Sequence, residues 1–240
     1  MSQVMPQRMN RLTRYGVNGF ARQLSMPVFT AALLFIGAGT LNWSWGWAFA
    51  CVYFFSWLGL NLALLRWNPE LLNIRGQRAR ELKGTKTWDW VLLSIYAVVL
   101  IVQPLVAGLD FRNGWSTPPP TFWLVVGNVL TVVAVAMIGW AMVYNRFFEG
   151  TVRIQEQRGH QVVSSGPYRF VRHPGYVGVI LSFVSLPLAL GTWTALIPGL
   201  IGIGVYLVRT TLEDRTLRTE LPGYADYAQH TRHRLIPGLW

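Results

Sequence analysis

The chain has 240 residues, of which 52% are hydrophobic and only 13% are charged. Soluble domains usually carry about 25% charged residues, so the composition argues against an ordinary soluble enzyme. The net charge of +11 requires no nucleic-acid partner, because its distribution along the chain follows membrane topology and suits contact with membrane lipids.

The apolar residues are gathered in six long blocks, which predict an all-α, polytopic membrane protein with about six hydrophobic helices. In chain order the blocks cover residues 26–41, 46–65, 88–108, 121–144, 175–190 and 193–208. The only charged residue within them is Asp89, at the start of the third block. The 25 residues before the first block are polar and basic.

The last two blocks predict a helical hairpin over residues 175–208. Each block has 16 residues, and only Gly191 and Thr192 separate them, which is too short for a loop outside the membrane. Pro187 and Pro198 lie inside the hairpin and are expected to kink it. Beyond the hairpin, the sequence favours a helix over residues 209–220 and a short helix over 224–230, with a break at Pro222-Gly223.

The basic residues fix the predicted orientation. Of the 21 Lys and Arg residues, 20 fall before the first block, in alternate connections or after the last block, and Arg112 is the exception. The positive-inside rule makes the basic face cytoplasmic, so both termini are expected there. The connection at 116–120, on the opposite side, is expected to act only as a stiff spacer. Two polar stretches, 145–174 and 209–240, flank the hairpin and are expected to meet at the cytoplasmic boundary.

This arrangement divides the chain into an N-terminal transmembrane region of about four helices, residues 1–144, and a core over residues 145–240. A pocket between the two polar stretches could take a water-soluble cofactor from one side and an apolar substrate from the bilayer. No ionisable side chain lies in the middle of a span, which disfavours an ion pump.

The most informative segment is 166–178. Pro174 restricts His173 to extended geometry and suits the first turn of a helix, which places Arg172 and His173 at a helix N-terminus that favours an anion. The alternative is that both residues only anchor the helix at the lipid headgroups. Further on, Arg209 and Glu213 are four residues apart and share one helix face, and here the alternative is an ordinary ion pair.

Together, segments 166–178 and 209–237 resemble the isoprenylcysteine carboxyl methyltransferase and phospholipid methyltransferase superfamily of integral membrane enzymes. The resemblance covers residues 145–240. It implies that S-adenosylmethionine binds to residues of both segments and of the preceding loop. The implied cofactor residues are Gln155, His160, Gln161, Val162, Val163, Tyr168, Arg172, His173, Pro174, Gly175, Tyr176 and Glu213.

The resemblance also implies that Glu213 and Arg209 are catalytic, with Arg209 on the substrate side. Asp214 departs from the family, which more often has a second Glu at this position. The implied activity is methyl transfer to an apolar or lipid-like acceptor, most simply a carboxylate or thiol of the isoprenylcysteine type, with no metal. The alternatives are an NADPH-dependent reductase of the sterol-reductase type and a non-catalytic membrane protein with a relic cofactor pocket.

Overall fold

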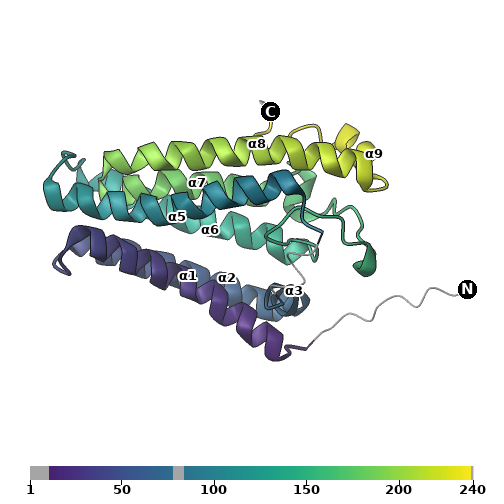
Figure 1. Cartoon of the computed structure of the whole chain (residues 1–240), viewed down its shortest axis with the longest axis horizontal. Helices are drawn as coiled ribbons and strands as arrows, with labels where there is room; N and C mark the ends of the chain where they lie inside the picture. The colour runs from purple at the N-terminus through teal and green to yellow at the C-terminus, as the bar shows by residue number, and fades with distance from the viewer. Residues whose placement is uncertain (1–10, 78–83, 239) are drawn as a thin grey trace, which may run out of the picture.

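The computed structural model describes residues 11–77, 84–238 and 240 (Figure 1). Every regular element among these residues is helical, which confirms the predicted all-α class. The long helices are α1 (Arg14–Ala38), α2 (Ser44–Trp67), α5 (Thr87–Asn113), α6 (Thr121–Tyr144), α7 (Pro174–Leu190) and α8 (Leu196–Glu220). The short ones are α3 (Pro69–Arg75), α9 (Tyr224–His230) and three single turns, η1 (Glu156–Arg158), η2 (Gly166–Arg169) and η3 (Trp193–Ala195).

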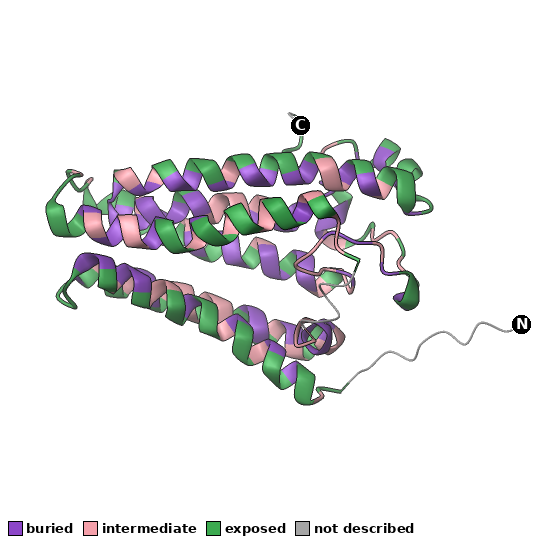
Figure 2. Ribbon diagram, in the orientation of Figure 1, coloured by how far each residue is buried: buried purple, intermediate pink, exposed green. Residues whose placement is uncertain are grey.

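The long helices have the length and surface of membrane spans. α1, α2, α5, α6 and the segment Trp193–Glu220 are each long and apolar enough to cross a bilayer, and α7 is a shorter apolar helix. Their outer faces expose large apolar side chains, such as Ile36 at 68% and Phe55 at 64%, and Figure 2 shows exposed residues along the whole bundle. Such a surface is suited to lipid and not to water. The protein is therefore a polytopic integral membrane protein, as the sequence predicts.

Small residues allow the helices to pack closely. α1 and α2 lie on one side of the bundle, and α5, α6, α7 and α8 lie on the other (Figure 1). Where α1 meets α5, a Cβ atom added at Gly108 would lie 2.2 Å from the carbonyl oxygen of Leu34. Where α6 meets α7, a Cβ atom at Gly127 would lie 2.1 Å from the backbone nitrogen of Ala189. Contact of this kind replaces the hydrophobic effect as the force between helices in lipid.

The C-terminal hairpin is present, and it depends on a buried amide from α5. Gly191 turns the chain with a φ of 68°, between α7 and η3. Pro187 has no N–H to donate to the carbonyl of Phe183, four residues earlier in α7. The side chain of Gln103 donates to that carbonyl at 2.8 Å and to the carbonyl of Ala195 at 3.2 Å. The hairpin is thus hydrogen-bonded to α5 at the proline.

The structure differs from the sequence expectations at three places near the helix ends. Pro198 lies in the first turn of α8, where a proline interrupts no hydrogen bond, so it does not kink the hairpin interior. α1 begins at Arg14 and not at residue 26, where its apolar block starts, because its polar first half packs against α3. The contact is close, since a Cβ atom at Gly19 would lie 2.2 Å from the carbonyl oxygen of Leu72. In contrast, α8 continues to Glu220 and α9 covers Tyr224–His230, as predicted.

The third difference concerns the 116–120 connection, which is more than a spacer. The buried carboxylate of Asp110, near the end of α5, accepts hydrogen bonds from the backbone and hydroxyl of Ser116 at 2.8 and 2.6 Å. It also accepts from the backbone of Thr194 at 3.1 Å, so the connection is fixed to the tip of the hairpin. The hydroxyl of Ser116 in turn accepts from the backbone of Trp193 at 2.9 Å.

Candidate cofactor site

The connection between α6 and α7 meets the last turns of α8 and the start of α9 around a cavity of about 90 Å³. The two polar stretches flanking the hairpin therefore come together, as the sequence predicts. The predicted cofactor residues that line the cavity are Gln155, His160, Gln161, Val162, Val163, Tyr168, Arg172, His173, Gly175, Tyr176 and Glu213. Pro174 begins α7 and, like Arg209, is not among the lining residues.

Gln155 and His160 form one wall of the cavity and are bonded to each other. The backbone N–H of Gln155 donates to Nδ1 of His160 at 3.3 Å, and the Gln155 side chain donates to the carbonyl of Phe147 at 2.8 Å. Burial, with the nearby cations of Arg158 and Arg153, lowers the pKa of His160 to about 4. His160 is therefore neutral at physiological pH, which leaves Nδ1 free to accept.

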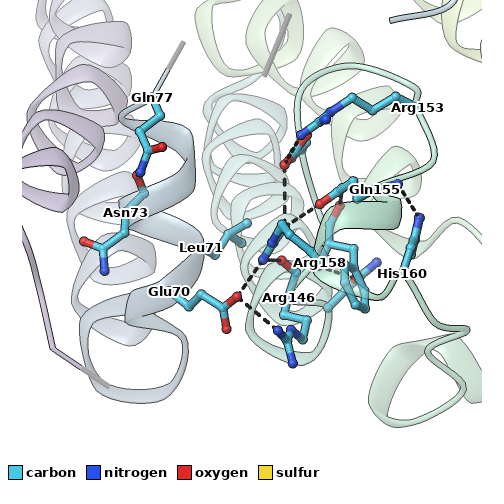
Figure 3. Close-up of polar contacts among 12 residues, drawn as sticks. Glu70, Leu71, Asn73, Gln77, Arg146, Arg153, Gln155, Arg158 and His160 are labelled. Carbon is cyan, nitrogen blue, oxygen red and sulfur yellow. Dashed lines mark hydrogen bonds and ion pairs between the residues drawn. The ribbon is translucent and has the colours of Figure 1, made fainter. Parts of the chain in front are cut away.

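A network of charges fixes this wall to α3 (Figure 3). Glu70 of α3 accepts from Arg158 at 2.9 Å and from Arg146 at 3.2 Å. The Arg158 guanidinium also donates to the carbonyl of Arg146 at 2.8 Å and makes a short hydrogen bond to the side-chain oxygen of Gln155. The N-terminal region thus holds the loop that carries Gln155, a role for Glu70 that the motifs did not indicate.

Tyrosines from η2 and α9 form another wall of the cavity. Tyr168 of η2 accepts a hydrogen bond on its hydroxyl from Asn145 at 3.1 Å, and its carbonyl accepts from the Tyr227 hydroxyl at 2.6 Å. Tyr224 lines the cavity beside them. Burial raises the pKa of Tyr168, and it raises the pKa of Tyr227 to about 12. These hydroxyls remain protonated, so the wall offers neutral aromatic rings.

Arg172 is a structural clamp in this conformation. Its guanidinium donates to Asp214 at 2.7 and 3.1 Å and to the carbonyls of Thr231 and Arg232, both at 2.7 Å. The backbone N–H groups of Arg172 and His173 donate to the carbonyls of His233 and Arg234. These donors were expected to favour an anion, but the C-terminal segment already occupies them.

Asp214 is the centre of this clamp. Besides Arg172, its buried carboxylate accepts from Arg218 at 3.1 Å, Arg234 at 3.2 Å and the hydroxyl of Tyr224 at 3.1 Å. The residue that departs from the family pattern therefore joins α8, α9 and the C-terminal segment. Its position beside Glu213, an acid at a membrane boundary, is the signal that could have identified it.

His173, Tyr176 and Glu213 form the part of the site with free binding capacity. The hydroxyl of Tyr176 donates to Glu213 through a short hydrogen bond, and the ring of His173 stacks on Tyr176 with centroids 5.5 Å apart. The buried Nε2 atom of His173 lies 3.6 Å from an Asp214 oxygen, beyond hydrogen-bond distance, and makes no hydrogen bond to any described residue. A buried polar atom without a partner at the wall of a cavity indicates a place for a ligand's hydrogen-bonding group.

Arg209 is paired with Asp89 of α5 and not with Glu213. Its Nε and Nη2 atoms donate to the Asp89 carboxylate at 2.7 and 3.2 Å, and Nη2 also donates to the carbonyl of Gly150 at 2.7 Å. The guanidinium lies over the rings of Tyr176 and Tyr206, 5.3 and 5.7 Å from their centroids. The i,i+4 pair that the spacing allowed is therefore absent from the described contacts.

A larger hollow of about 1040 Å³ lies between α2 and α6, beside the cofactor cavity. Small residues that face each other make room for it, among them Gly59 and Ala63 on α2 and Ala136 and Gly139 on α6. Its polar end includes Glu70 and Arg146. The two spaces share four lining residues, Phe147, Gln161, Val162 and Val163.

The described residues contain no group of three or more His, Cys, Asp or Glu side chains that could hold a metal ion. The cavity is lined by aromatic rings, amides, the imidazoles of His160 and His173, two carboxylates and two paired guanidiniums; the carboxylates are those of Glu149 and Glu213 and the guanidiniums those of Arg153 and Arg172. This donor set suits an organic ligand with a cationic or polar head.

Comparison with known families gives one match. Residues 123–219 match the model of the isoprenylcysteine carboxyl methyltransferase family. The matched region runs from α6 through the connection between α6 and α7, residues 145–173, which we call the cofactor loop, and through the hairpin to the end of α8. A comparison with curated proteins found no relative that matches the chain.

Proposed function

We propose that this chain, whose residues 123–219 match the isoprenylcysteine carboxyl methyltransferase family, transfers the methyl group of S-adenosylmethionine to an apolar acceptor in the membrane. The family match indicates a methyltransferase. The cofactor and the acceptor are our inferences from the site, and the observation that carries them is the cavity in which His173, Tyr176 and Glu213 meet.

The residues present fit this cofactor. The Nε2 atom of His173, 3.6 Å from Asp214 and without a hydrogen bond, can bind a hydroxyl group, and Glu213 can accept hydrogen bonds from an ammonium or ribose. The rings of Tyr168 and Tyr176 can face a sulfonium through cation–π attraction. The loop residues Gln155 and His160, with the 160–163 run, would line the adenosine.

S-Adenosylmethionine brings a methyl group that is already electrophilic because it is bound to a sulfonium. The chain then has to align the two reactants and exclude water. Holding donor and acceptor in line lowers the activation barrier without any covalent or acid–base step by the protein. The cavity of about 90 Å³ is smaller than the roughly 300–1,000 Å³ of typical ligand sites. We infer that the cofactor loop moves outward when the cofactor enters.

The hollow between α2 and α6 supports an acceptor that arrives from the bilayer. It opens beside apolar helix faces, and Phe147 and the 161–163 segment separate it from the cofactor cavity. A carboxylate or thiol on an isoprenylcysteine-type molecule would present its polar group at this boundary. Arg209 lines neither this hollow nor the cofactor cavity and is paired with Asp89, so it would contact the acceptor only if that pair opens, whereas Glu213 lies in the cofactor cavity.

Titration of the purified protein with S-adenosylhomocysteine, the demethylated product, tests this proposal. We expect calorimetry to show saturable binding of S-adenosylhomocysteine and none of NADPH. Glu213→Ala should weaken the binding by roughly 1.5–3 kcal/mol, the usual range for a hydrogen bond to a charged group. Glu220→Ala is the matched control, because Glu220 lies on the same helix and pairs with Lys86 outside the cavity. Binding of NADPH, or equal affinities in the two variants, would contradict the proposal.

A further inference from the structure

Asp89 is a fully buried carboxylate that lies outside the family match. It is in the first turn of α5, in the N-terminal region of the chain, and it is 0% exposed. It is also the only charged residue within the six apolar blocks. A buried acid in such a helix is costly unless its oxygens are paired, so its partners indicate what it does.

Those partners come from two separate parts of the core. One carboxylate oxygen accepts from Nε of Arg209 on α8 at 2.7 Å. The other accepts from Nη2 of Arg209 at 3.2 Å and from the backbone N–H of Val152 in the cofactor loop at 2.7 Å. A single side chain of α5 therefore joins α8 to the loop that closes the cofactor cavity.

Both links end at the cofactor cavity. Val152 is one of its lining residues. Arg209 is not, but its guanidinium lies over the ring of Tyr176, whose hydroxyl is bonded to Glu213, and Tyr176 and Glu213 both line the cavity. Asp89 thus determines the position of two cavity walls without touching the cavity itself.

We propose that Asp89 is a positioning residue of the cofactor site, which holds Arg209 and the Val152 backbone so that Tyr176, Glu213 and the cofactor loop face one another. The proposal rests on the proposed function. It assigns to the N-terminal region a part in cofactor binding that the family match does not cover. It also accounts for a buried charge in the first turn of an apolar helix.

The experiment compares Asp89→Asn with Asp110→Asn in the purified full-length protein. Asp110 is the matched control, because it is also a buried aspartate of α5 that accepts several hydrogen bonds, but it lies at the opposite end of the helix. The readouts are the affinity for S-adenosylhomocysteine by calorimetry and the midpoint of thermal unfolding. We expect Asp89→Asn to weaken binding by at least about fivefold, whereas Asp110→Asn lowers the midpoint and leaves affinity within about twofold.

A double variant, Asp89→Asn with Arg209→Gln, tests the mechanism. Removing one partner leaves an unpaired buried charge, whereas removing both leaves two amides that can pair. The double variant should therefore bind S-adenosylhomocysteine more tightly than Asp89→Asn and more weakly than the wild type. If Asp89→Asn does not fold, the double variant alone is compared with the wild type, and weaker binding is expected.

Three results would overturn this role for Asp89. The first is wild-type affinity in Asp89→Asn, and the second is an equal loss of affinity in Asp89→Asn and Asp110→Asn. The third is a double variant whose affinity lies outside the expected interval, either equal to that of the wild type or below that of Asp89→Asn. A wild-type protein that does not bind S-adenosylhomocysteine would instead refute the proposed function, and this inference with it. The two failures are therefore distinguishable.

Discussion

His160, which lines the cofactor cavity, is a single side chain that makes the stability of the fold depend on pH. Its pKa is lowered to about 4 from an ordinary value near 6.5, first by burial and then by Arg158 and Arg153. A group whose pKa is lower in the folded state stabilises the fold above the unfolded pKa. That contribution is lost as the pH falls from about 6.5 toward 4, because the unfolded chain takes up the proton first.

We predict that acidification from pH 7.5 to pH 5.0 destabilises the wild type more than His160→Asn. The asparagine oxygen can still accept from the Gln155 backbone, but the side chain does not titrate. The difference in the free energy of unfolding should be at most about 2 kcal/mol, because His160 is partly exposed and solvent screens the neighbouring cations. Thermal unfolding of both proteins, in one detergent at both pH values, measures this difference. Equal losses of stability in the wild type and His160→Asn would contradict the lowered pKa of His160.

At the scale of the elements, the hairpin shows how a membrane helix accommodates an internal proline. Pro187 leaves the Phe183 carbonyl of α7 without its helical donor, and Gln103 of α5 supplies one at 2.8 Å. No water in the hydrocarbon layer can replace that donor. The same amide reaches the Ala195 carbonyl, so one side chain fixes both arms of the hairpin to α5.

Gln103→Leu should therefore destabilise the protein by about 1–3 kcal/mol, the cost of an unsatisfied buried carbonyl. Asn128→Leu is the control, because Asn128 is also a buried amide in a span, but it donates to Leu124 of its own helix. That carbonyl already has a helical donor, and the Asn128 oxygen has no partner among the described residues. We expect the midpoint of thermal unfolding to fall only in Gln103→Leu; equal effects would show that the link to α5 is unimportant.

At the scale of the whole molecule, the apolar blocks predicted the architecture because a bilayer imposes a minimum length on each span. The ends of the helices were less accurate. α1 begins twelve residues before its apolar block, since its polar half is stabilised by contact with α3, and contacts between distant segments leave no local pattern. The breaks after Glu220 and before Tyr224 were predictable because Pro222 and Gly223 act locally.

The same distinction applies to the site. The candidate residues from Gln155 to Glu213 were identified in the sequence because they form compact motifs, and the structure places most of them around one cavity; that they bind the cofactor stays a prediction. The acids that hold them, Glu70 and Asp89, come from helices far away in the chain, so only their burial and contacts identify them. For Asp89 the sequence shows a charge in an apolar block, which indicates that its carboxylate has a buried partner. The sequence does not indicate that this partner is Arg209.

The orientation of the bundle in the membrane is the last prediction. Connections at one end of the bundle follow α2, α6 and α8, and this is the end with the cofactor cavity (Figure 1). Of the 21 Lys and Arg residues, 20 belong to this side by sequence, and Arg112 near the end of α5 belongs to the other. Since translocating basic residues is unfavourable, we propose that the cavity and both termini face the cytoplasm, where S-adenosylmethionine is available.

Reporter fusions at Gly114 and after Trp240 measure this orientation. Gly114 is the residue that ends α5 at the opposite end of the bundle from α9, with a φ of 62°. A reporter there should be active only outside the cytoplasm, and a reporter after Trp240 only inside it. Replacing the basic residues around α3 by glutamine is the matched perturbation: it should mix the orientations if the charges determine them. Two reporters on the same face would instead mean that the chain crosses the bilayer an even number of times between these points, and not three times through α6, α7 and α8.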